Sequence, residues 1–173
     1  MEAVFMELAE LNMLDTKERA VALIKCCGAK HWVEQMNTIF PVANEEILLN
    51  EAERIWFQCN EKDWLEAFAH HPKIGDIHSL KEKYAATSPW AEGEQSSVKQ
   101  SSSEVLEALA KGNTAYEDKF GYIFIVCATG QSAKEMLDML LLRLKNNAAQ
   151  EIHIAMQEQN KITAIRLKKL LAP

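Results

Sequence analysis

The sequence has few of the residues that break helices, since glycine occurs six times and proline four times in 173 residues. Helices need few tight turns, so this scarcity favours a helical protein. Long apolar runs are missing as well. The longest, Ile123 to Ala128, is far below the roughly 20 residues that span a bilayer. We therefore expect no membrane partner.

Positive charge is also limited. The chain has 19 Lys and Arg against 25 Asp and Glu, which gives a net charge of −6. Because proteins that bind nucleic acid electrostatically are usually basic, we expect no nucleic-acid partner. Glu2, Glu7 and Glu10 stand where a signal peptide would be basic, and Leu170 to Pro173 is not a peroxisomal S-K-L signal. These features predict a cytoplasmic location.

The four cysteines, Cys26, Cys27, Cys59 and Cys127, include no C-x-x-C pair. This pattern favours buried, inert thiols in a reducing cytosol over disulfides or a zinc site. The spacing of His70, His71 and His78 matches no zinc motif either. We therefore expect no metal and no redox cysteine.

Hydrophobic residues make up 48% of the sequence, which is enough for a packed core. Capping residues followed by apolar residues at helical spacing predict helices after Asp15, Asn44, Asn60 and Ser132. Further helices are predicted over about 30–38 and 148–170. We expect Ile152, Ala155, Ile162 and Ile165 to mark the buried side of the last helix.

Three other segments give weaker patterns. Residues 76–92 look loop-rich, and the five serines within 96–103 suggest the exposed side of a helix, although Ser101-x-x-Glu104 also permits a later start. Residues 120–128 are β-prone but have no comparable strand to pair with, so we expect a buried extended segment or a helix there. The expected fold is all-α: one compact domain over residues 1–173, with about seven to nine helices and no significant sheet.

The sequence His71-Pro72-Lys73-Ile74-Gly75-Asp76 is the strongest candidate for a functional site. Proline disfavours helical geometry in the preceding residue, so His71 should lie at or just beyond a helix end. Histidine changes charge most easily near neutral pH. Together with Glu94 and Gln95 downstream, His71 suggests an acid–base site, although a histidine at a helix end often only binds a backbone carbonyl.

Arg166 falls on or beside the apolar stripe of the last helix. A guanidinium there needs an anion or good acceptors, so the residue is a ligand contact, part of a structural ion pair, or a long side chain that reaches out to solvent. The residues alone thus indicate a helical cytosolic domain with a candidate His/Glu site. They contain no G-x-S-x-G, P-loop or G-x-G-x-x-G motif.

Taken in order, several motifs resemble the 2-oxo-4-hydroxy-4-carboxy-5-ureidoimidazoline (OHCU) decarboxylase family of purine catabolism. The specific set is HPKIGD at 71–76, Gly93-Glu94-Gln95 and FIVCA at 124–128. Further matching stretches cover nearly the whole chain: Leu11-Asn12, Cys26-Cys27-Gly28 with Trp32, Trp64 to Phe68, Tyr116 with Phe120-Gly121, Arg143-Leu144 with Asn146, Glu151, Lys161-Ile162 and Arg166-Leu167.

The resemblance implies a cofactor-free, all-helical decarboxylase that is commonly a homodimer and acts on the small molecule OHCU. It implies that His71 and Glu94 are catalytic. The residues that it implies for substrate binding are Pro72, Ala91, Glu92, Gly93, Gln95, Phe124, Ile125, Val126, Cys127, Ala128 and Arg166. Many family members carry serine at the position of Ala91, so one hydroxyl contact is missing here or comes from another group such as Ser88.

Two other classes of function are alternatives. One is a hydrolase of a related ureido compound, which usually needs a metal or an activated water. The other is a non-catalytic helical interaction module, which would not require histidine, glutamate, glutamine and arginine to meet.

Overall fold

The computed structural model describes residues 5–73, 75–85 and 95–171, and these residues form helices α1 to α9 and no strand. The all-α prediction is confirmed. The chain folds as two compact units, each built from separate stretches. The first unit contains residues 1–71, 125–127 and 152–173, and the second contains 72–124 and 128–151. The last helix belongs to both, since its first four residues lie in the second unit.

The first unit holds helices α1 (Leu8–Met13), α2 (Thr16–Cys26), α3 (Lys30–Asn37), α4 (Glu45–Gln58) and α5 (Glu61–Ala69), with most of α9 (Ala148–Leu171). Three of these helices begin at caps read from the sequence. Asp15, Asn44 and Asn60 each accept hydrogen bonds from backbone N–H groups of the first turn. Such caps satisfy donors that would otherwise lack partners.

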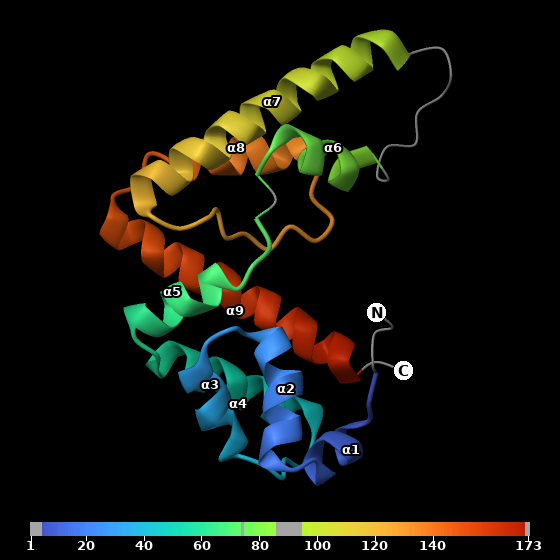
Figure 1. The fold of residues 1–173 in the computed structure, drawn as a ribbon, viewed down its shortest axis with the longest axis vertical. Coiled ribbons are helices and arrows are strands. Elements are labelled where there is room, and N and C mark those ends of the chain that lie inside the picture. The colour runs from blue at the N-terminus through green and yellow to red at the C-terminus, as the bar shows by residue number, and fades with distance from the viewer. Residues whose placement is uncertain (1–4, 74, 86–94, 172–173) are drawn as a thin grey trace. The chain divides into compact units, whose positions relative to one another are not determined.

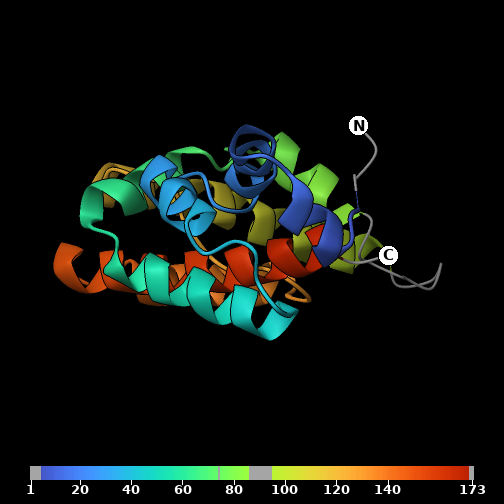
Figure 2. The same ribbon diagram turned by 90° about the horizontal axis from the view of Figure 1, so that it is seen from below.

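The core of the first unit is formed where α3 and α4 meet each other and where α4 runs beside α9 (Figures 1 and 2). Trp32 and Trp56 are almost fully buried. Their indole N–H groups donate to the carbonyl oxygens of Ala52 at 3.1 Å and Met156 at 2.9 Å, so neither buried donor is left without an acceptor. These bonds place α4 against α3 and against α9.

The second unit holds α6 (Ile77–Ala85), α7 (Gln95–Phe120), α8 (Ala133–Arg143) and the first turn of α9. Ser132 caps α8 with a complete capping box, as the sequence predicts. Helices α7 and α8 lie side by side (Figure 1). Gly112 allows this close approach, because a Cβ atom there would stand 2.6 Å from a methyl group of Leu140.

The prediction of a loop over 76–92 is wrong for its first part, since α6 begins at Ile77. The missed signal is Asp76, whose carboxylate accepts from the N–H groups of His78 at 3.0 Å and Ser79 at 2.9 Å. Asp76 therefore acts as a helix cap as well as the end of the HPKIGD motif. Residues 96–103 are helical, as the main interpretation of the serine-rich segment predicts, because α7 begins at Gln95; the alternative of a later start is wrong.

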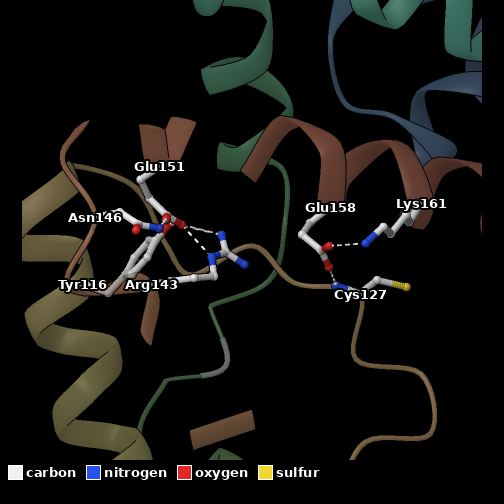
Figure 3. Close-up of polar contacts among 7 residues, drawn as sticks. All are labelled: Tyr116, Cys127, Arg143, Asn146, Glu151, Glu158 and Lys161. Atoms are coloured by element: carbon white, nitrogen blue, oxygen red, sulfur yellow. Dashed lines mark hydrogen bonds and ion pairs between the residues drawn. The ribbon is translucent and has the colours of Figure 1, made fainter. Parts of the chain in front are cut away.

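In the β-prone segment 120–128, Phe120 is the last residue of α7, and residues 123–128 form neither helix nor strand. Ile125 is buried and the residues around it are half-buried. The backbone N–H of Cys127 donates to the Glu158 carboxylate at 2.7 Å (Figure 3). Glu158 also pairs with Lys161. The acceptor for this backbone N–H is thus a side chain of α9 and not the backbone of a neighbouring strand.

No helix among the described residues is both long and apolar enough to cross a membrane.

Candidate functional site

His71 lies just past the end of α5, as the following proline predicts. The backbone N–H of His71 donates to the Phe68 carbonyl at 3.2 Å, and the residue is half-buried. The preceding residue, His70, packs closely against α2's end. A Cβ atom on Gly28 would stand 2.3 Å from the Cβ of His70, so only glycine fits there. The chain that carries the imidazole is therefore held at a defined place.

Two side chains of α9 contact the imidazole ring of His71, one at each ring nitrogen. Gln159 Oε1 lies 2.5 Å from His71 Nε2, and Arg166 Nη2 lies 3.4 Å from His71 Nδ1. Gln159 itself is fully buried and bonds through Nε2 to the Thr163 hydroxyl at 3.1 Å. Positions 159, 163 and 166 are four and three residues apart, so they share one face of the helix.

Arg166 makes no structural ion pair within the part of the chain that the structure describes. Its other guanidinium nitrogen donates to the Lys25 carbonyl at 3.4 Å. The role of Arg166 as a ligand contact stays a prediction. A guanidinium that lacks a carboxylate retains its capacity to bind an anion through several donors.

The electrostatics keep His71 neutral. Burial lowers the pKa of its imidazole below the usual 6.5, and the positive charge of Arg166 lowers it further, while the hydrogen bond to Gln159 opposes both. The ring is thus an uncharged base at neutral pH. When the ring is neutral, the Arg166 guanidinium can donate a hydrogen bond to a ring nitrogen that carries no proton.

Burial disfavours the nucleophilic thiolate form of the buried cysteines. Burial raises the pKa of Cys26 to about 11 and that of Cys27 to about 12, so both remain thiols at neutral pH. Burial likewise raises the pKa of Cys59 to about 12. The prediction of buried thiols is correct for these three and wrong for Cys127, which is half-buried.

Only some of the remaining predicted site residues lie within the part of the chain that the structure describes. Pro72 is exposed, and the backbone of 124–128 is described above. The Phe124 ring packs against Tyr116 at 5.1 Å between ring centroids. Ala91, Glu92, Gly93 and Glu94, together with the alternative Ser88, lie outside the described residues, as does the side chain of Gln95. The pairing of His71 with Glu94 therefore stays a prediction.

Gln159 and Thr163 are the site residues that the sequence analysis missed. Both are polar residues that are at most 2% exposed, and they lie on a helix face that the sequence analysis interpreted as apolar. The available signal was spacing, because Gln159 lies four residues after Ala155 and interrupts the stripe. Two of the residues read as buried, Ile162 and Ile165, are only half-buried.

A second polar cluster lies in the second unit. Arg143 Nε and Nη2 both contact Glu151 Oε1, at 2.7 and 2.5 Å, and Asn146 donates to Glu151 Oε2 at 2.9 Å (Figure 3). The Tyr116 hydroxyl also donates to Glu151. The carboxylate is completely buried and accepts from Arg143, Asn146 and Tyr116, which favours a structural role for this cluster. Among the described residues, no group of three or more His, Cys, Asp or Glu side chains is placed to hold a metal ion.

The fold is that of a known class of enzymes. A crystal structure of OHCU decarboxylase in the presence of (S)-allantoin superposes with a TM-score of 0.71 at 35% identity, over 92% of this chain and all of that one. A crystal structure of (S)-allantoin synthase has the same fold, with a TM-score of 0.67 at 18% identity, over 95% of this chain and 54% of that one.

The sequence comparisons define the family. The family model for OHCU decarboxylase matches residues 12–168, and the chain belongs to this family. It is 41% identical to the uric acid degradation bifunctional protein TTL of Arabidopsis thaliana, over 85% of this chain and 45% of that protein. It is 25% identical to the uric acid degradation bifunctional protein of Bacillus sp. strain TB-90, over 95% of this chain and 32% of that protein. The chain thus spans less than half the length of these two relatives.

Proposed function

We propose that the protein decarboxylates OHCU to (S)-allantoin in urate degradation, without a cofactor. The observation that carries the proposal is the Arg166 guanidinium 3.4 Å from Nδ1 of His71, an arrangement in which a neutral ring nitrogen can accept a proton. OHCU bears a hydroxyl and a carboxylate on the same carbon. The hydroxyl of such a group can donate to the imidazole nitrogen, while an anionic or carbonyl oxygen accepts from the guanidinium. Membership of the decarboxylase family supports the same reaction.

The substrate supplies its own electron sink. When the bond to the carboxylate breaks and CO2 leaves, its electron pair forms a double bond to the neighbouring ring carbon, and the electrons of the C=N bond move to nitrogen, which takes up a proton. The hydroxyl then gives up its proton to become a carbonyl, and the former imine carbon takes up a proton on one face. His71 receives the hydroxyl proton as general base. No step requires an external electron acceptor.

Glu94, Gln95 and the backbone of 124–128 complete the proposal. Glu94 assists His71 in proton transfer. Gln95 and backbone N–H groups hold the ureido group and the ring carbonyl, with Pro72 and residues 91–93 lining the same site. The working enzyme is a cytoplasmic homodimer.

The test follows freshly generated OHCU by ultraviolet absorbance and the product by circular dichroism. The wild-type protein is expected to accelerate decay and to yield optically active allantoin, with the same rate in the presence of a chelator. General acid–base catalysis is typically worth about 10²–10⁴-fold, so His71→Asn should lose activity by that order while its circular dichroism spectrum stays helical.

His78→Asn serves as the matched control, because His78 is exposed and lies seven residues further along the chain. This variant should retain wild-type rates. Racemic product at the spontaneous rate from wild-type protein would support the interaction module instead. Chelator-sensitive hydrolysis of a ureido compound would support the hydrolase, and full turnover in His71→Asn would remove the central role of that residue.

A further inference from the structure

Gln159 and Thr163 have no role in the reaction as described so far, yet they are the most buried polar neighbours of His71. Gln159 is 0% exposed and Thr163 is 2% exposed. Burying an amide and a hydroxyl is unfavourable unless both are hydrogen-bonded, so each of these two groups needs a hydrogen-bond partner. The directions of these hydrogen bonds determine which atoms carry protons.

The direction of the hydrogen bonds follows from the chemistry of each group. Gln159 Nε2 donates to the Thr163 hydroxyl oxygen at 3.1 Å. The amide is thereby oriented with its carbonyl oxygen toward His71 Nε2. A carbonyl oxygen only accepts, so His71 Nε2 must carry the proton.

The other side of the imidazole ring gives the same answer. Arg166 can only donate, and its Nη2 lies 3.4 Å from His71 Nδ1. A proton on Nδ1 would set two donors against each other. Flipping the Gln159 amide would require that proton on Nδ1, and the ring would then present a donor to the Arg166 guanidinium. The two sides of the ring thus select one tautomer.

We propose that Gln159, oriented by Thr163, is a positioning residue that holds His71 in the Nε2–H tautomer and so makes Nδ1 the atom that receives the substrate's hydroxyl proton. The inference rests on the proposed function for its catalytic part. Its structural part, the tautomer itself, is independent of any substrate.

The charge of the side chain at position 159 matters as well as its position. Gln159 is a neutral acceptor, whereas a carboxylate at that position would stabilise the imidazolium. The charged and titratable groups that act on the ring within the described part of the first unit are Arg166 and His70, and both disfavour a positive charge there. A neutral amide therefore orients the ring without making it charged.

The experiment uses the full chain with 15N-labelled histidine and two-bond 1H–15N correlation spectra, which distinguish the two tautomers. The sequence contains five histidines, and the His71→Asn spectrum assigns the relevant signals. Wild-type His71 should show Nε2–H at alkaline pH. Gln159→Met, which keeps the size but removes the acceptor, should show a mixture of tautomers. Gln159→Glu should retain Nε2–H and raise the midpoint of the titration by about one pH unit or more.

Kinetics then test the catalytic part. Because the whole acid–base contribution is typically about 10²–10⁴-fold, loss of the single tautomer should lower kcat by roughly 10- to 100-fold in Gln159→Met, with a smaller change in KM. In Gln159→Glu the acid limb of the kcat/KM profile should move to higher pH together with the titration. Gln157→Met is the matched control, since Gln157 is exposed on the same helix, and it should behave as wild type.

The outcomes separate the two proposals. Nδ1–H in the wild type, or an unchanged tautomer in Gln159→Met, overturns the inference even if OHCU is consumed normally. Should Gln159→Met fail to fold, an unshifted titration in Gln159→Glu overturns it in the same way. A wild-type protein that shows the expected tautomer but does not accelerate OHCU decay overturns the proposed function, and with it the role of Nδ1 as the proton acceptor.

Discussion

The imidazole of His71 lies between a neutral acceptor, Gln159, and a cationic donor, Arg166. This combination differs from the common pairing of histidine with a carboxylate, which raises basicity. Here the local charges favour the neutral ring. At the scale of the single residue, the site is therefore built to present a base that is already unprotonated at neutral pH.

This electrostatic arrangement predicts a specific pH dependence. Burial and then Arg166 depress the pKa of His71, so its titration midpoint and the midpoint of the acid limb of kcat/KM should both lie below pH 6.5. Because the unfolded chain binds this proton more readily than the folded one, the contribution of His71 to stability is present above pH 6.5. It is lost as the pH falls below that value.

Arg166→Gln should raise the midpoint toward 6.5, because it removes the positive charge beside the ring. Nuclear magnetic resonance titration of His71 measures the midpoint without substrate. Lys168→Gln is the control, since it removes an exposed cation from the same helix, and it should leave the midpoint unchanged. A wild-type midpoint above 6.5, or no change in Arg166→Gln, would contradict the stated cause.

At the scale of the helical element, most of the fold could be predicted from local chemistry. Asp15, Asn44, Asn60 and Ser132 cap helices as expected, because a short polar side chain before an apolar face is an unambiguous start signal. Asp76 gives the same signal for α6 but was read only as part of a functional motif. Short α1, over Leu8–Met13, was not predicted, because its N-cap is Glu7, which is not a usual cap residue.

The candidate site was less predictable than the helices. His71 follows from the proline after it and Arg166 from its place on an apolar stripe, but their meeting depends on tertiary packing of α5 against α9. Gln159 was missed because a single amide within an apolar face has no local pattern that marks it as a partner. The network that orients the ring spans 88 residues of sequence between His71 and Gln159.

The buried Arg143–Glu151 pair predicts how α8 and the start of α9 are held together. The side chains are 7% and 0% exposed. Removing one partner of a buried pair leaves the other charge uncompensated and typically costs about 3–5 kcal/mol. Glu151→Leu should therefore lower the free energy of unfolding by that amount, measured by urea denaturation followed by circular dichroism.

The double variant Arg143→Met/Glu151→Leu should recover much of that loss, because no buried charge is then left alone. Lys134→Met, which removes the exposed partner of Asp138 on α8, is the control and should change stability by less than about 1 kcal/mol. A Glu151→Leu variant as stable as the wild type would show that the pair is not what holds these elements.

At the scale of the whole molecule, the two compact units are not consecutive in sequence. The first needs residues 152–173, which come after the entire second unit. Met156 and Leu167 of α9 are buried in the core of the first unit, and the Met156 carbonyl is the acceptor for the Trp56 indole. The first 71 residues therefore do not contain the whole core of the unit to which they belong.

A chain that ends at Asn147 should consequently fail to fold its first unit. Burial of Met156 and Leu167 alone contributes about 3–6 kcal/mol at about 1.5–3 kcal/mol for each side chain. That is comparable with the total stability of about 5–15 kcal/mol expected of a folded protein.

Near-ultraviolet circular dichroism reports on the buried Trp32 and Trp56, and their signal and the cooperative thermal transition should both be lost. A synthetic peptide of residues 148–171 added in trans should restore the signal, and it should do so less well when Met156 and Leu167 are both replaced by alanine. A shortened chain that kept the tryptophan signal without the peptide would show that residues 1–71 form a core on their own.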